Sequence, residues 1–304
     1  MVITGKTIKG YLAAIASAVI YGCMPLMANL IYAEGCSPMT LVLLRNLLAI
    51  PALAAMALIQ NKTLKIPLKM APRICGTSLL GGCVTPLLLF SSYQFMDGGT
   101  ATVFHFIYPA IVVLIGVLLK EEKNVLGSVL SMVLCVAGIG LFYTPGAPID
   151  WRGGGLALFS GFTYAAYIIL LAHSNTKNVS GFLYSFYLAV SCSVVTFVIC
   201  LVTGQLSLPN SLLGWGLCFL FAIGISCGAV VLFQIGTFLI GGPQASILSA
   251  LEPVTSVIVG ILVLHEVVNG RTVAGTVLVL ASSVFVALMN SQKKKASKQS
   301  ASKK

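Results

Sequence analysis

Long runs of apolar residues with almost no charge dominate this chain. Ten of them are each about 20 residues long, which as a helix is enough to cross the hydrocarbon core of a bilayer. With 58% hydrophobic and only 8% charged residues, the composition does not suit a soluble protein. Strands in a membrane would alternate apolar and polar residues, and these runs do not alternate. An all-α integral membrane protein is therefore predicted, with spans near 8–33, 38–59, 74–95, 99–119, 124–143, 153–173, 179–203, 211–238, 243–264 and 271–290.

One of these runs occurs twice. The segment YPAIVVLIGVLLKEE at 108–122 returns 144 residues later as EPVTSVIVGILVLHE at 252–266. Five positions are identical in the two copies: Pro109 and Pro253, Val113 and Val257, Gly116 and Gly260, Leu118 and Leu262, and Glu122 and Glu266.

The start of each half of the chain also repeats. GYLAAIASAVIYG at 10–22 resembles GGGLALFSGFTYA at 153–165, and this alignment pairs Tyr21 with Tyr164. Because the repeat spacing carries the chain from the fourth span to the ninth, the second copy crosses the bilayer in the opposite direction. Two inverted five-helix halves are predicted. Their boundaries are residues 1–148 and 149–290, and a lysine-rich tail at 291–304 has no apolar face to bury.

Positive residues are distributed unevenly between the predicted loops. With the N-terminus in the cytoplasm, fifteen of the eighteen Lys and Arg residues lie on the inner side, and only Arg152 and Arg271 lie outside. Positive residues near helix ends are retained on the cytoplasmic side, so both termini are predicted there, with the chain in the plasma (inner) membrane. The net charge of +11 then belongs mostly to the inner face and the tail. No basic, aromatic-bearing surface suggests a nucleic-acid partner.

Several other classes of protein lack support. No GxxxxGK phosphate loop is present, so any driving force would be a gradient rather than ATP hydrolysis by this chain. The nine cysteines show no CxxC spacing and are interpreted as buried small hydrophobic residues, so no metal or cofactor is expected. Seven acidic residues and three histidines offer no catalytic set at mid-membrane depth, and no enzyme is predicted.

Three features together resemble the EamA-domain branch of the drug/metabolite transporter superfamily. They are the doubled stretch from Pro to Glu, the segment SPMTLVLLRN at 37–46, and the two five-helix halves, and they cover about residues 8–290. The chain departs from the family in having Tyr21 where Trp is frequent, and in having no second-half match for Arg45. The resemblance implies ten helices as inverted repeats around a central cavity, moving small metabolites, commonly outward. It does not name a substrate.

Glu252 lies near the middle of the ninth span. Insertion scales place the cost of a central acidic residue at about 2.5–3.5 kcal/mol, so this one should be protonated, paired or in contact with water. Three interpretations are open: a proton-coupling carboxylate, an anchor for a substrate ammonium group, or a structural hydrogen-bonding partner. Because ionisable groups inside a membrane are usually functional, the first two are favoured.

Helical spacing extends a polar face around this carboxylate. Ser249 and Ser256 share a face with Glu252, and the matching positions in the fourth span include His105 and Tyr108. These two faces are predicted to meet at the pseudo-twofold axis and to form a polar cavity. His105 is either a titrating group or a neutral imidazole held by one hydrogen bond between helices.

Four further polar residues are candidates for the site. Arg45 lies about seven residues into the second span, where it could extend to the headgroups or bind a carboxylate of the protein or of a substrate. Tyr21, Tyr164 and Gln234 could line the cavity, and each has the alternative role of joining two helices.

These features predict a secondary-active transporter that moves small polar metabolites such as amino acids by alternating access. Export is the expected direction, and proton coupling is one option. The partners would be a small-molecule substrate and the lipid bilayer. The alternatives are an uncoupled facilitator, an exchanger or a channel, and an intramembrane enzyme has less support.

Overall fold

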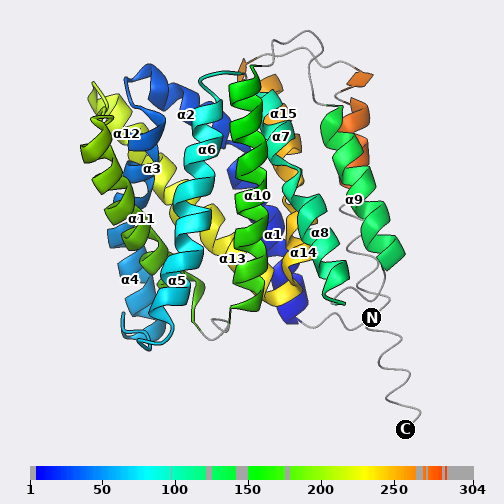
Figure 1. Ribbon diagram of the computed structural model, residues 1–304, viewed down its shortest axis with the longest axis horizontal. Coiled ribbons are helices and arrows are strands. Elements are labelled where there is room, and N and C mark those ends of the chain that lie inside the picture. Colours follow the sequence, from blue (N-terminus) through cyan, green and yellow to red (C-terminus); the bar gives the residue numbers. More distant parts are fainter. Residues whose placement is uncertain are drawn as a thin grey trace.

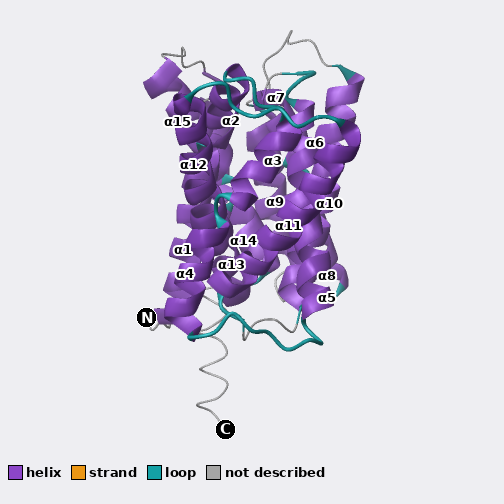
Figure 2. Cartoon of the chain, turned by 90° about the vertical axis from the view of Figure 1, so that its left-hand side faces the viewer, coloured by secondary structure: helices purple, strands orange, loops and turns teal. Residues whose placement is uncertain are grey.

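Every regular element that the structure describes is helical, and no strand occurs in the described ranges. The helices stand side by side as an upright bundle in this computed structural model (Figure 1), and a view from the side shows the same arrangement (Figure 2). The described residues are 5–96, 98–120, 125–141, 150–174, 179–264, 270–271, 273–282 and 285. The predicted tail at 291–304, the predicted boundary at residue 148, and Glu122 and Glu266 lie outside these ranges.

Six helical stretches are long and apolar enough to cross a membrane, and the protein is therefore an integral membrane protein. They coincide with six of the predicted spans and are Gly5–Ala33, Pro38–Asn61, Ala71–Ser92, Trp151–His173, Gly181–Thr203 and Leu212–Ile240. Shorter apolar helices cover Tyr108–Leu118, Val125–Gly140 and Val273–Ser282.

Most of the long stretches are built from consecutive shorter helices. The first half contains α1 (Gly5–Gly22), α2 (Met24–Ala33), α3 (Pro38–Leu47), α4 (Ile50–Asn61), α5 (Ala71–Ser78), the π-helical segment η1 (Leu79–Val84), α6 (Thr85–Ser92), α7 (Gly98–His105), α8 (Tyr108–Leu118) and α9 (Val125–Gly140). The second half contains α10 (Trp151–His173), α11 (Gly181–Thr203), α12 (Leu212–Phe221), the π-helical segment η2 (Ala222–Ala229), α13 (Val230–Ile240), α14 (Gly242–Leu248) and α15 (Leu251–Leu264).

The fourth and ninth predicted spans are each interrupted, where the sequence predicted one continuous helix. α7 is followed by α8 after two non-helical residues, and α14 is followed by α15 in the same way. Pro109 and Pro253 lie in the first turn of α8 and α15. Since proline has no backbone N–H to donate to the preceding turn, a helix restarts readily at these positions.

These irregularities fall at matched positions in the two halves of the chain. α7 and α14 end at His105 and Leu248, which are 143 residues apart. The π-helical segments begin at Leu79 and Ala222, with the same separation. The repeat seen in the sequence is therefore also present in the places where the helices deviate from α geometry.

Helices from the two halves pack against one another. α1 packs on α13 and α15, α10 packs on α6, α7 and α8, and α11 packs on α3 and α4. In Figure 1, α1 and α10 lie near the middle of the bundle, while α9 lies at one edge and α4 and α12 lie toward the other. The middle of the bundle is thus enclosed by helices of both halves.

Two glycines allow helices to come close around this middle region. A Cβ at Gly161 of α10 would lie 2.6 Å from the carbonyl oxygen of His105, at the interruption between α7 and α8. A Cβ at Gly22 of α1 would lie 2.8 Å from the carbonyl oxygen of Glu252. Any larger residue would force these helices apart, because such distances are shorter than normal van der Waals contact.

Candidate functional site

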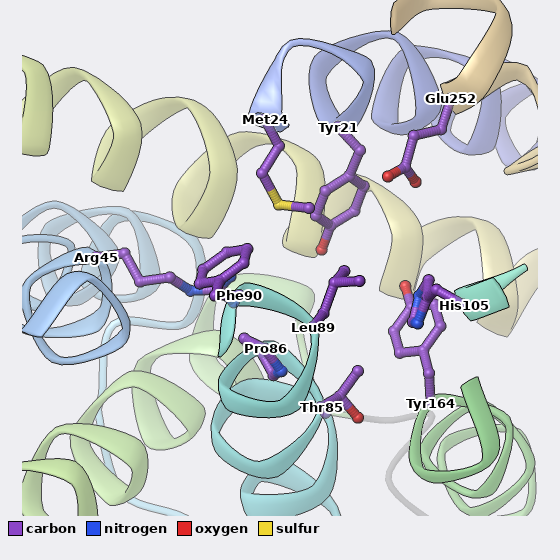
Figure 3. A pocket seen from close by; sticks show the side chains of 11 residues that line it. Tyr21, Met24, Arg45, Thr85, Pro86, Leu89, Phe90, His105, Tyr164 and Glu252 are labelled. Carbon is purple, nitrogen blue, oxygen red and sulfur yellow. The ribbon is translucent and has the colours of Figure 1, made fainter. Parts of the chain in front are cut away.

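A small cavity lies inside the bundle, between helices of both halves (Figure 3). Its walls come from α1, α2, α3, η1, α6, α7, α10 and α15. The residues that line it are Tyr21, Met24, Arg45, Gly81, Thr85, Pro86, Leu89, Phe90, His105, Tyr164 and Glu252. Five of the eight site residues predicted from the sequence are therefore brought together: Tyr21, Arg45, His105, Tyr164 and Glu252.

The cavity has a volume of about 40 Å³. One water molecule needs about 10–15 Å³ of such space, so the cavity has room for a few waters. Sites for drug-sized ligands have volumes of about 300–1,000 Å³. In this conformation the cavity is too small for a metabolite, so its walls would have to move before one could bind.

Glu252 is the second residue of α15 and is only 8% exposed. Its carboxylate lies close enough to the hydroxyls of Tyr21, Tyr108 and Tyr164 to interact with them electrostatically. Because α15 begins inside the bundle, the positive end of its helix dipole also lies at this carboxylate. A helix that restarts at mid-depth with its N-terminus at a binding site is a recurring feature of membrane carriers.

Arg45 is in the last turn of α3 and is only 3% exposed. Its side chain points into the bundle, so the alternative in which it extends to the headgroups is wrong. The guanidinium carbon lies 5.9 Å from the centre of the Phe90 ring. Within the part of the chain that the structure describes, Arg45 Nε has no hydrogen-bond partner.

His105 has a defined hydrogen-bond partner on α10. Its Nδ1 lies 2.7 Å from Ser160 Oγ, and that hydroxyl donates its hydrogen to the carbonyl oxygen of Ala157. The His105 Nδ1 must therefore be the donor in this pair, which in a neutral ring leaves Nε2 as an acceptor. The imidazole also lies 5.4 Å from the Tyr164 ring, between ring centres. A hydrogen bond between helices thus accounts for one ring nitrogen but not for the other.

Tyr108 and Ser249 meet as the sequence predicted, but they do not line the cavity. Ser249 Oγ donates to backbone carbonyls of its own helix, so Tyr108 Oη donates to Ser249 Oγ, at 2.6 Å. Both residues are almost fully buried. This contact joins α8 to the end of α14, and the two interrupted helices pack against each other there.

Removing the Tyr108 hydroxyl tests whether this contact stabilises the fold. Tyr108→Phe should lower the free energy of unfolding by about 0.5–1.5 kcal/mol, the typical net contribution of one hydrogen bond. Ser249→Ala should have an effect of similar size, and the double variant should be no worse than either single variant. Thermal unfolding of the purified proteins measures all three. Fully additive losses would show that the two hydroxyls are not coupled.

Gln234 was predicted to belong to the site, and the structure places it elsewhere. It is fully buried in α13, where its Oε1 accepts from Ser185 Oγ at 3.0 Å and its Nε2 donates to Tyr167 Oη at 3.4 Å. Both sides of the amide are therefore occupied by helix contacts. Ser256 likewise donates to the carbonyl oxygen of Gly22, at 2.7 Å, and joins α15 to α1.

The third span also contributes to the cavity, although none of its residues was among the eight predicted site residues. Thr85, Pro86, Leu89 and Phe90 of α6 form one wall of the cavity. Pro86 was a usable signal, because proline leaves the carbonyl four residues earlier without its helical partner. That carbonyl belongs to Gly82, and it accepts from Asn46 Nδ2, at 3.3 Å. The bond ties α3, which carries Arg45, to η1.

Helices that are interrupted at matched positions around a buried polar cavity, within a bundle of membrane-length helices, are typical of membrane transport proteins. The model of the EamA-like transporter family matches residues 8–144 and again residues 151–288. The chain belongs to this family of transporters, within the drug/metabolite transporter superfamily.

Two individual proteins are similar to this chain over most of its length. The uncharacterized inner membrane transporter YicL of Salmonella typhimurium (strain LT2) is 27% identical over 310 residues, which cover 93% of this chain and 97% of that protein. A protein of known crystal structure superposes with a TM-score of 0.77 over 92% of this chain and 96% of its own, at 17% identity. The second comparison shows a shared fold.

Proposed function

We propose that this chain is a secondary-active transporter that exports small polar metabolites, such as amino acids, by alternating access. Glu252 would be the group that receives the coupling proton or a cationic group of the substrate. The observation that carries this proposal is the buried carboxylate at the start of α15, in a cavity built by both halves of the chain. Export is the direction commonly found in the family.

The architecture proposed for this activity is ten helices, arranged as two inverted five-helix repeats. Two observations support it: the family model matches each half separately, and the interruptions and π-helical segments recur 143 residues apart. The proposed halves are residues 1–148 and 149–290, followed by a cytoplasmic tail at 291–304. Both termini would be cytoplasmic, in the plasma (inner) membrane.

Alternating access would open the cavity to each side of the membrane in turn. Since the cavity of about 40 Å³ admits only a few waters, binding a metabolite requires the walls to separate. The interruptions in α7–α8 and α14–α15 are suitable places for such a change, because two short helices joined by a turn can reorient more easily than one long helix. Tyr108 and Ser249 would keep the two interruptions in contact during this movement.

The proposed orientation predicts which side of the membrane a reagent can reach. Ala33→Cys lies at the end of α2 and Lys65→Cys follows α4, at opposite ends of the bundle (Figure 1). A membrane-impermeant maleimide added outside intact cells should label Ala33→Cys and leave Lys65→Cys unlabelled until the cells are opened. The wild-type chain, whose nine cysteines are buried or half-buried, gives the background. The reverse labelling pattern would invert the orientation.

A further inference from the structure

We propose that Arg45 is the anion-binding end of the cavity, and that the substrate is a zwitterion whose carboxylate pairs with this guanidinium. This inference rests on the proposed function and names its substrate class. An α-amino acid is the simplest compound of this kind: its ammonium group would face Glu252 and its carboxylate would face Arg45.

Arg45 is a buried cation with no ion-pair partner in the described part of the chain. The guanidinium stays protonated at every physiological pH. A charge inside a protein is costly unless an opposite charge or several hydrogen bonds compensate it. Phe90 is its ring contact, at 5.9 Å, and Nε has no acceptor among the residues the structure describes. Within the same ranges no carboxylate forms an ion pair with it. The compensating anion is therefore not supplied by this part of the protein.

Arg45 and Glu252 lie on opposite sides of the cavity. Figure 3 shows Arg45 at one side of the cavity and Glu252 at the other, with Tyr21 between them. The Tyr21 hydroxyl is within electrostatic reach of both groups. The cavity therefore presents a guanidinium and a carboxyl group from opposite sides, and no ion pair joins the two among the described residues. A ligand carrying both charges would satisfy both ends at once.

The shapes of the groups at the two ends of the cavity match those of an amino acid. Arginine offers a planar fork of N–H donors that matches the two oxygens of a carboxylate. The ring of Phe90 lies against the guanidinium and would hold its plane in place. At the other end the hydroxyls of Tyr21 and Tyr164 lie within electrostatic reach of each other and of Glu252. Phenol oxygens and a carboxylate are acceptors suited to an ammonium group.

A structural role for Arg45 is the competing explanation. The residue is in the last turn of α3, where a cation also interacts favourably with the free carbonyls at the end of the helix. If Arg45 has only that role, its replacement should lower the affinity for every ligand to the same extent. If Arg45 binds the substrate carboxylate, its replacement should lower the affinity mainly for ligands that carry a carboxylate.

The test measures binding to the purified full-length protein in detergent. The probes are a panel of L-amino acids, each compared with its methyl ester, which lacks the negative charge, and with its N-acetyl derivative, which lacks the positive charge. Binding is read from the rise in unfolding temperature with probe concentration. The proteins are the wild type, Arg45→Met, Arg45→Lys, and the control Arg73→Met, which removes an exposed cation from α5.

Wild-type protein should bind at least one amino acid about tenfold or more tightly than its methyl ester, as expected for a hydrogen-bonded charge pair. Arg45→Met should remove this preference, reducing affinity for the amino acid about tenfold while changing that for the ester less than about threefold. Arg45→Lys should keep part of the preference, and Arg73→Met should behave as the wild type. If Arg45→Met does not fold, the wild type and Arg45→Lys still report the preference.

Three results would overturn the proposal: equal losses for amino acid and ester in Arg45→Met, wild-type binding of the ester as tight as that of the amino acid, or no amino acid that binds. Failure of the proposed function would look different. If amino acids bind with the Arg45-dependent preference but are not moved across proteoliposome membranes, the binding assignment stands and the transport proposal fails.

Discussion

Glu252→Gln is expected to abolish transport driven by a pH gradient. Glutamine has almost the same shape as glutamate and can still form hydrogen bonds, but it can neither take up a coupling proton nor pair with an ammonium group. The affinity for an ammonium-bearing substrate should fall by about tenfold or more. The measurement is uptake into proteoliposomes, with and without an imposed pH gradient, of the amino acid that most stabilises the purified wild type.

The same experiment separates the two roles considered for this carboxylate. If Glu252 only carries the proton, exchange of substrate between two pools without a pH gradient should survive in Glu252→Gln. If it also holds the ammonium group, exchange should be lost as well. Glu34→Gln is a suitable control, because it removes a half-buried carboxylate that accepts from Ser211 Oγ outside the cavity. Undiminished pH-driven flux in Glu252→Gln would remove this residue from the mechanism.

Gly161→Leu is also expected to reduce transport strongly. A side chain here would begin 2.6 Å from the carbonyl oxygen of His105 and equally close to Ile107. Overpacking of this kind typically costs about 1–3 kcal/mol, and relief requires α10 to move away from the interruption between α7 and α8. His105 and Tyr164 line the cavity from these same elements, so transport should fall more than overall stability alone would explain.

Gly155→Leu provides a control on the same helix. A Cβ at Gly155 meets nothing within 4 Å, so leucine there should be tolerated and should leave transport close to that of the wild type. Unfolding temperature and transport rate are measured for both variants. If Gly161→Leu unfolds and transports like Gly155→Leu, the close approach of α10 to the interruption is not needed by the protein.

Most of the fold could be predicted from the sequence because few kinds of backbone structure can span a bilayer. Apolar runs of about 20 residues must form helices there, and the duplicated stretch indicated two related halves. It did not predict the interruptions at 106–107 and 249–250, because an apolar run has the same composition whether its helix is continuous or broken. Pro109 and Pro253 marked both places, but a proline can also be accommodated in a kinked helix.

Part of the site could be predicted from the sequence, because burying a charged residue is costly and because the internal repeat pairs positions of the two halves. Glu252 and Arg45 are expensive to bury, so their presence in apolar runs indicated a role before any geometry was known. His105 followed from the repeat, as the matched position of Ser249. Gln234 does not line the cavity in this structure, because the rotation of α13, which the sequence does not give, turns this amide toward Ser185 and Tyr167. The wall formed by α6 was missed because most of its residues are ordinary apolar ones.

The most direct test of the proposed carrier is counterflow in proteoliposomes. Vesicles containing the purified chain are loaded with a high concentration of the unlabelled amino acid that binds best, and are diluted into a trace of the same compound in labelled form. A carrier with one alternately exposed site should accumulate the label transiently above its external concentration, and Glu252→Gln should do so only if Glu252 serves the proton alone. Simple equilibration of the label without an overshoot would indicate a channel and would contradict alternating access.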